Sequence, residues 1–198
     1  MATKKQDKGG GMDAIELLRK DHDDVNRMFD EFESADEDRK FELAAEICQA
    51  LTVHATIEEE IFYPQARAAI DAEELMLEAE VEHDSAKHLI ERIQEGEVDE
   101  TELSAMIKVL KEYVGHHINE EQRKMFPRVK RSELDLEAIG RELMERKVEL
   151  ESEISTAMAE DDSGEALDVD DDDEDTGKGP LAGGHGRPQQ GPMTGIVR

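Results

Sequence analysis

Apolar residues recur along most of this chain at steps of three or four, the spacing that places them on one face of an α-helix. Ile15, Leu18, Val25 and Phe29 follow this spacing and predict a first helix over residues 12–34. The same spacing predicts four further helices, over residues 39–70, 72–95, 99–130 and 135–160. No segment alternates at every second residue as a half-buried strand does, so we expect an all-α protein.

The predicted helices also divide the chain into parts. Because their connections are short, residues 12–130 are expected to form an up-down-up-down four-helix bundle. A further C-terminal helix within residues 131–160 has a narrower apolar stripe and lies either against the bundle or against another subunit. Residues 1–11 and 161–198 hold too few apolar residues to bury a core, and the second of these tails is acidic and then Gly/Pro-rich. We expect both tails to be disordered.

Each predicted bundle helix carries a histidine where the spacing requires an apolar residue. These histidines are His22, His54, His83 and His117. Two of them begin a motif in which a glutamate follows four residues later, so that an imidazole and a carboxylate share one helix face. The motifs pair His54 with Glu58 and His117 with Glu121, and a proline follows ten residues after each histidine. The two histidines of the first half are 32 residues apart and those of the second half 34, which indicates an internal duplication with an approximate two-fold axis.

Four histidines and two glutamates that point into one layer of a bundle have the composition of a dinuclear metal site. Imidazole and carboxylate together suit first-row transition metals such as iron, manganese or zinc, and a bridging carboxylate suits a pair of them. If each metal takes two histidines and shares both glutamates, an octahedral ion keeps two positions open. The candidate metal ligands are His22, His54, Glu58, His83, His117 and Glu121.

Two simpler interpretations compete with the metal site. A single inward-facing histidine is more often a hydrogen-bonded core residue than a ligand. Alternatively, the helix phases are wrong and all six residues face water. Neither interpretation accounts well for the glutamates, because an unpaired buried carboxylate costs several kcal/mol and the spacing of the six residues is regular.

The neighbours of the candidate ligands give further expectations. Tyr113, one turn before His117, either donates a hydrogen bond to the site or packs in the core. Glu59, Glu60 and Glu120 flank the candidate glutamates and are expected to face solvent. No residue is assigned a catalytic role.

Charge and composition narrow the classes of partner. The net charge is −28, from 52 acidic and 24 basic residues, which opposes binding to nucleic acid or to an anionic membrane. Residues 1–11 lack the apolar core of a signal peptide, and no apolar run reaches the length of a membrane span, so we expect a cytoplasmic protein. The single cysteine, Cys48, excludes an internal disulfide and a cysteine-rich metal site.

These motifs resemble those of the hemerythrin family, in the branch of the bacterial HHE cation-binding proteins. The resemblance covers about Met12 to Lys130 and rests on Asp21-His22-Asp23, His54-xxx-Glu58 with Phe62-Tyr63-Pro64, Glu82-His83-Asp84, and His117-xxx-Glu121 with Phe126-Pro127. It implies a non-haem di-iron centre that binds oxygen or related small molecules, with the six candidate residues as iron ligands.

The chain differs from the oxygen-carrying hemerythrins at two positions. The carriers have a further histidine four residues after the one that matches His83, where this chain has Lys87. They also have an aspartate where this chain has Glu121. The loss of one imidazole leaves a more symmetric and more open iron pair, closer to HHE proteins that resemble iron-centre repair proteins and iron or oxygen sensors.

The sequence therefore predicts a protein that holds two iron ions and binds or senses oxygen, peroxide or nitric oxide. Manganese or zinc would suit the same ligands. Two alternatives stay open: an oxidoreductase acting on peroxide or nitric oxide, and an iron-buffering protein that gives its iron to other proteins. The oligomeric state does not follow from these patterns.

Overall fold

A computed structural model of the chain describes residues 11–96 and 98–162. Every regular element in these two ranges is a helix and neither range contains a strand, which confirms the all-helical fold class. The predicted tails lie outside these ranges, apart from Gly11 and from Asp161 and Asp162, which extend the last helix. None of the helices in the described ranges combines the length and apolar character needed to cross a membrane.

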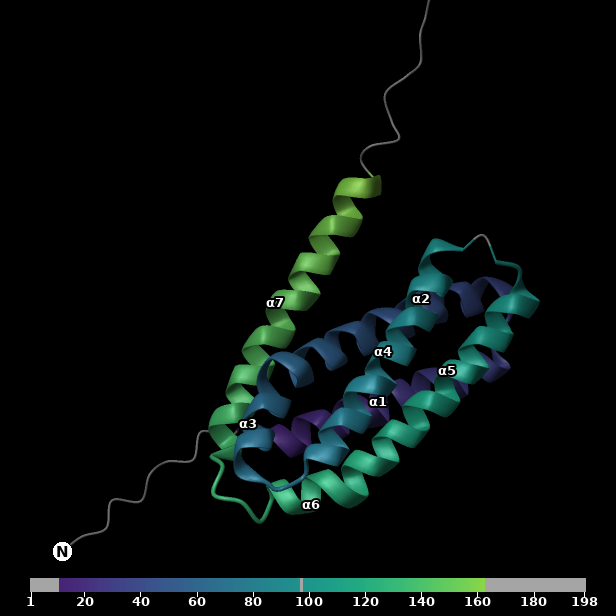
Figure 1. The fold of residues 1–198 in the computed structure, drawn as a ribbon. Coiled ribbons are helices and arrows are strands. Elements are labelled where there is room, and N and C mark those ends of the chain that lie inside the picture. Colours follow the sequence, from purple (N-terminus) through teal and green to yellow (C-terminus); the bar gives the residue numbers. More distant parts are fainter. Residues whose placement is uncertain (1–10, 97, 163–198) are drawn as a thin grey trace, which may run out of the picture.

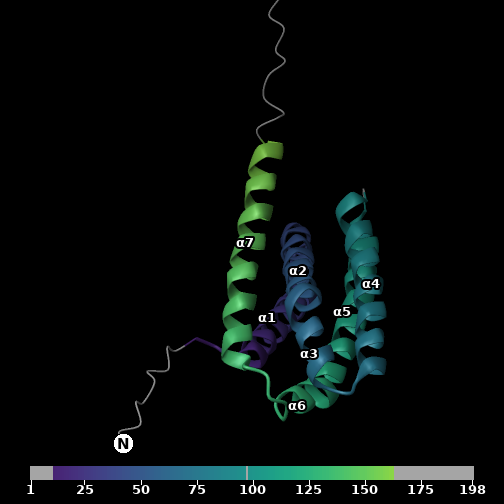
Figure 2. The same ribbon diagram turned by 60° about the vertical axis from the view of Figure 1, so that its left-hand side comes forward.

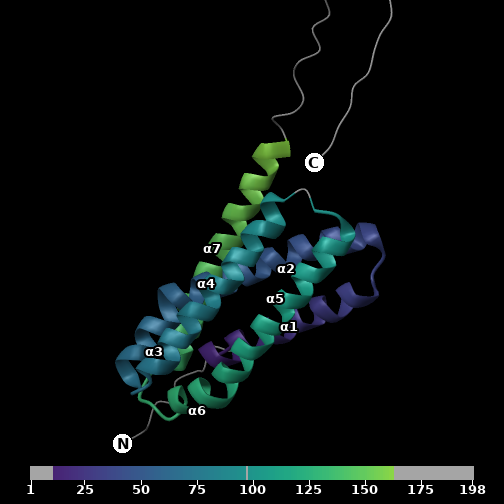
Figure 3. The same ribbon diagram turned by 45° about the vertical axis from the view of Figure 1, so that its right-hand side comes forward.

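Four long helices lie side by side: α1 (Ala14–Ser34), α2 (Glu37–Ile57), α4 (Glu73–Glu95) and α5 (Glu100–Glu120) (Figures 1 and 3). α1 packs against α2, α4 packs against α5, and α2 also contacts both α4 and α5. Aspartates fix three of the starts, because Asp13, Asp36 and Asp99 each accept a hydrogen bond from the backbone N–H three residues later. The apolar spacing placed all four starts within two residues of those observed.

The helices predicted over 39–70 and 99–130 are each interrupted by one π-helical turn. α2 leads through η1 (Glu58–Phe62) into α3 (Tyr63–Ala69), and α5 leads through η2 (Glu121–Met125) into α6 (Phe126–Val129). The backbone N–H of Tyr63 bonds to the Glu58 carbonyl, and that of Phe126 bonds to the Glu121 carbonyl, each five residues earlier. A proline, which has no N–H to donate, follows directly in both places. A π turn therefore precedes each of the two prolines.

The apolar core forms two clusters. One lies where α3, α6 and the start of α7 (Leu136–Asp162) meet, and it includes Leu18 and Phe126. The other fills the opposite part of the four long helices, and it includes Val25 and Leu110. Along α1, His22 stands between Leu18 of the first cluster and Val25 of the second, so a polar layer separates them. Among the described residues, the buried polar and charged side chains are His22, His54, Glu58, His83, His117 and Glu121.

α7 lies beside α1 and α2, on the side of the molecule away from α4 (Figure 2). The sequence left open whether this helix covers the bundle or another subunit, and the structure places it on α1, α2 and η1 of its own chain. Ile139 and Leu143 are buried in the first cluster. Gly140 lies so close to α1 that a Cβ atom there would be 2.4 Å from the Met12 carbonyl oxygen and 2.9 Å from the Ala14 nitrogen.

The close contact at Gly140 reverses the usual effect of replacing a helical glycine. In an open helix position, Gly→Ala stabilises by about 0.5–1 kcal/mol, and we expect this at Gly115 of α5, where a Cβ would meet nothing within 4 Å. At Gly140 the added methyl group meets backbone atoms, so Gly140→Ala should lower the free energy of unfolding by about 1–3 kcal/mol. Urea unfolding of both variants measures the difference, and equal stability of the two would contradict this packing of α7.

Candidate metal centre

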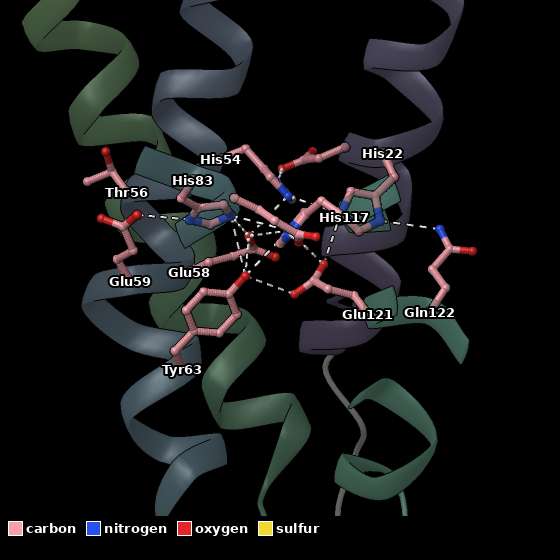
Figure 4. A network of polar contacts seen from close by, with 12 residues as sticks. His22, His54, Thr56, Glu58, Glu59, Tyr63, His83, His117, Glu121 and Gln122 are labelled. Atoms are coloured by element: carbon pink, nitrogen blue, oxygen red, sulfur yellow. Dashed lines mark hydrogen bonds and ion pairs between the residues drawn. The ribbon is translucent and has the colours of Figure 1, made fainter. Parts of the chain in front are cut away.

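The structure brings all six candidate residues together in the polar layer (Figure 4). The four histidines come from the four long helices, one from each. Glu58 and Glu121 are the first residues of the two π turns and are 0% and 1% exposed. All six side chains are buried, so the interpretation in which they face water is wrong.

The six side chains form two overlapping groups. His22 and His54 join both glutamates in one group, and His83 and His117 join Glu58 in the other, with the ligand atoms of each group within 4.8 Å of one another. The Nε2 atoms face each other in pairs, 3.0 Å apart for His22 and His54 and 3.2 Å apart for His83 and His117. Glu58 Oε2 lies 3.3 Å from Nε2 of His54 and 3.4 Å from Nε2 of His83, so this carboxylate stands between the groups.

The two carboxylates retain capacity to bind a cation. Glu58 Oε1 and Glu121 Oε2 are buried, and neither has a hydrogen-bond partner within the described part of the chain. A buried carboxylate oxygen without a donor is unfavourable unless a positive charge lies next to it. Imidazole nitrogens that face each other across about 3 Å also suit a shared electrophile. The residues present therefore fit a metal ion or a pair of ions.

Tyr63 completes the layer, although the helical spacing of the sequence does not mark it as a site residue. Its hydroxyl has one proton, which it shares between Glu58 Oε2 at 3.2 Å and Glu121 Oε1 at 3.1 Å, and it lies 3.4 Å from His83 Nε2 (Figure 4). Burial, followed by the two glutamate charges, raises the Tyr63 pKa well above its usual value, so the hydroxyl keeps its proton. Tyr113, the tyrosine named from the sequence, is 45% exposed and lines a cavity next to the histidines.

The histidines of α4 and α5 are oriented from behind by glutamates. His83 Nδ1 donates to Glu59 Oε1 at 2.8 Å, and His117 Nδ1 donates to Glu82 Oε2 at 3.0 Å. A proton on Nδ1 leaves Nε2 free to bind a metal, which is how outer carboxylates commonly orient metal-binding histidines. The expectation that the flanking glutamates face solvent is wrong for Glu59, whose side chain is 32% exposed and binds His83, and for Glu120, whose side chain is 16% exposed. It is confirmed for Glu60, whose side chain is 47% exposed.

Lys87 binds the carboxylate that orients His83. Its Nζ donates to both oxygens of Glu59, at 2.7 and 2.6 Å. The hydrogen bond from His83 lowers the pKa of Glu59. Burial opposes this effect, and the contact with Lys87 adds to it. Position 87 is therefore occupied by a cation that holds the carboxylate behind His83.

The other two histidines have different outer partners. The Gln122 amide lies 3.2 Å from His22 Nδ1. Asp21 Oδ2 lies 3.6 Å from His54 Nδ1, which is slightly too long for a hydrogen bond. Burial would raise the pKa of Asp21, but its contacts with His54 and Lys147 lower it, so this carboxylate is charged.

A cavity of about 530 Å³ adjoins the imidazole side of the layer. All four histidines line it, together with apolar side chains from α1, α2, α4 and α5 such as Val25, Leu51, Ile90 and Val114, whereas the two glutamates and Tyr63 are not among its lining residues. Its size lies within the range of about 300–1,000 Å³ that is typical of small-molecule sites. The acidic lining residues are Asp21, Asp24, Glu46, Glu82 and Glu151. The basic lining residues are Lys87 and Lys147, and each of these two lysines is ion-paired with a carboxylate.

The charges of the layer depend on one another. Burial alone would raise the pKa of Glu58, but the imidazoles of His54, His117 and His83 hold it well below its usual value. Burial alone would lower the pKa values of His83 and His117, but the surrounding glutamates raise both. Without a metal, the buried carboxylates therefore favour the protonated forms of His83 and His117, whose charge then offsets theirs.

This balance predicts how the metal-free protein responds to pH. Because folding raises the pKa values of His83 and His117 above 6.5, their stabilisation is complete below that pH and is lost as the pH rises through the raised values. The free energy of unfolding at about pH 6 should therefore exceed that at a mildly alkaline pH, as measured by urea unfolding at both. Glu58→Gln should weaken this dependence, since the neutral amide no longer raises the histidine pKa values. A metal-free protein equally stable at both pH values would contradict the charge balance.

Comparisons with known proteins agree with this geometry. Residues 13–129 match the hemerythrin HHE cation binding domain. A DNA nickase of Nostoc sp. strain PCC 7120 is 29% identical over 123 residues, which cover 60% of this chain and 34% of that protein, so the chain spans about a third of the length of this curated relative. No solved structure matches the chain. Since the family match covers more than half of the chain and contains all six clustered residues, the chain belongs to the hemerythrin family, with an HHE cation binding domain at residues 13–129.

Proposed function

We propose that this protein is a non-haem di-iron protein of the cytoplasm that binds or senses oxygen, peroxide or nitric oxide. One observation carries the proposal: a buried layer of four histidines and two glutamates in which two carboxylate oxygens have no hydrogen-bond partner among the described residues. We interpret α1, α2, α4 and α5 as an up-down-up-down four-helix bundle built around this layer, an arrangement in which di-metal centres are common.

The two groups of side chains suggest how the metals would be held. His22, His54 and Glu121 would hold one ion, His83 and His117 would hold the other, and Glu58 would be shared. Two iron ions held by these residues would supply redox chemistry and open coordination positions for a small molecule. Manganese and zinc suit the same set of nitrogen and oxygen donors.

The surrounding residues favour a small uncharged ligand. The cavity reaches the layer from the imidazole side, and its walls are largely apolar, so it can admit neutral molecules such as oxygen, nitric oxide and hydrogen peroxide. Acidic side chains outnumber basic ones around it, and both lysines are already paired, which disfavours anions. On the other side, Tyr63 keeps its proton and shares it between the two carboxylates, both of which lie within hydrogen-bond distance of its hydroxyl.

Tyr63 gives one of the alternatives specific support. A buried hydroxyl within 3.5 Å of two candidate metal-binding histidines could donate a proton in an oxidoreductase that acts on peroxide or nitric oxide. Iron buffering remains the third candidate. We do not extend the name of the Nostoc relative to this chain, because the shared part is about a third of that protein and the net charge of −28 opposes contact with DNA.

The first test is metal content. We expect about two iron ions per chain after loading the full-length protein with ferrous iron, as a carboxylate-bridged pair requires. Glu58→Gln should reduce this to fewer than one ion per chain, because Glu58 belongs to both groups of side chains. Glu112→Gln, on the exposed surface of α5, is the matched control and should bind as the unmodified chain does. Unchanged metal content in Glu58→Gln would exclude this site.

Kinetic measurements on the iron-loaded protein separate the three functions. A persistent, reversible optical change on mixing the reduced protein with oxygen supports a binding or sensing protein. Oxygen release from hydrogen peroxide over many turnovers supports the enzyme. Rapid transfer of the iron to a weak chelator, with neither of these reactions, supports a buffer.

The cavity gives a prediction of its own. Ala86→Phe places a ring into the cavity wall and should slow the reaction of the reduced protein with oxygen several-fold while leaving the iron content unchanged. Ser85→Phe adds the same ring to the exposed face of α4 and serves as the control. Stopped-flow spectroscopy measures both rates. Equal rates in the two variants would show that the ligand reaches the layer by another route.

A further inference from the structure

α7 lies outside the part of the chain that matches the HHE domain, yet two of its basic side chains reach the region of the candidate metal centre. Arg146 pairs with Glu60 at 2.7 Å, and Lys147 pairs with Asp21 at 2.5 Å. Glu60 lies on the outer surface of η1, where its side chain is 47% exposed. Asp21, by contrast, directly precedes His22 and is only 8% exposed.

Asp21, the partner of Lys147, lies between this lysine and His54. Lys147 Nζ binds Asp21 Oδ1, while Asp21 Oδ2 faces His54 Nδ1 at 3.6 Å. Oδ2 and Nδ1 are both buried, and neither has a hydrogen-bond partner within the described residues. A small movement would therefore join them, and the direction in which Asp21 points decides whether it can orient this imidazole.

The other half of the layer has the same order of groups. Lys87 binds Glu59, and Glu59 accepts a hydrogen bond from His83 Nδ1. Lys87 belongs to α4, inside the family domain, whereas Lys147 comes from α7. Each half of the layer thus places a lysine and a carboxylate behind one histidine, but one of the lysines is supplied from outside the domain.

The packing of α7 explains how Lys147 is held in place. Ile139 and Leu143 are buried in the first apolar cluster, and Gly140 allows α7 to touch the start of α1. Lys147 follows Leu143 by one helical turn, so it lies on the same face of α7 and is directed to the α1 residue Asp21. Lys147 and Glu151 also line the cavity, so α7 forms part of its wall.

We propose that Lys147 is a positioning residue of the metal centre: it fixes Asp21 so that this carboxylate orients His54, and α7 is thereby a fifth structural part of the site. This inference rests on the proposed function, since it takes His54 as a metal ligand. An orienting carboxylate keeps the proton on Nδ1 and leaves Nε2 free to bind a metal. Without Lys147, Asp21 is free to turn toward the solvent.

Metal retention tests this role. Lys147→Met keeps most of the apolar stem and removes the charge, and in the iron-loaded full chain it should weaken metal retention about 10- to 100-fold, the usual effect of losing an outer-sphere partner. Lys147→Arg should restore retention. Arg146→Met, which removes the neighbouring ion pair of α7, is the matched control and should have little effect. Retention in Lys147→Met that equals either the unmodified chain or Arg146→Met would overturn the proposal.

A second measurement does not depend on metal. Nitrogen-15 NMR of the histidine rings in the metal-free full chain reports the tautomer and surroundings of each imidazole. Lys147→Met should change the signals of His54 and leave those of His83 as they are. If the unmodified chain binds no iron but this change occurs, the proposed function fails and the positioning role stands. If the chain binds iron and the His54 signals do not change, the positioning role fails alone.

Discussion

The burial of two carboxylates in an apolar core is the constraint on which the rest of this structure depends. Glu58 and Glu121 are almost completely removed from water, and charged groups persist there only when positive charge and hydrogen bonds surround them. Here the four imidazoles and the Tyr63 hydroxyl surround the two carboxylates. Further carboxylates, on the outer side of the imidazoles, accept hydrogen bonds from two of them and so orient these rings. The apolar clusters on either side of the layer lower the local dielectric constant, which strengthens each of these interactions.

The two halves of the chain meet this constraint in similar but not identical ways. In each half a π turn begins at the buried glutamate and leads into an aromatic residue and a proline. The ring of Tyr63 packs 5.5 Å from His83, and the ring of Phe126 stacks 5.9 Å from His22. Only Tyr63 carries a hydroxyl group. The two halves therefore supply a nearly symmetric set of nitrogen donors and an asymmetric set of hydrogen bonds, which makes the two candidate metal positions chemically different.

Much of the fold and most of the candidate site could be predicted, because helical periodicity is a local property. The spacing gave the helix bounds, and it placed His22, His54, His83 and His117 on inward faces without knowledge of any partner. Tyr63 was missed because the π turn changes which residues share a face, and Pro64 was the only local sign of that turn. Treating the glutamates next to Glu58 as surface residues was wrong for Glu59, which contacts α4.

The sequence by itself determined an all-helical chain whose inward stripes carry four histidines and two glutamates, since these positions follow from a repeat of three to four residues. Only the tertiary structure decided how α7 docks, where the cavity opens, and that Lys147 reaches Asp21 across 126 residues of chain. Such contacts depend on the relative placement of whole helices, which local spacing does not specify. The buried glutamates thus follow from the sequence, and the groups that orient their histidine partners follow from the packing.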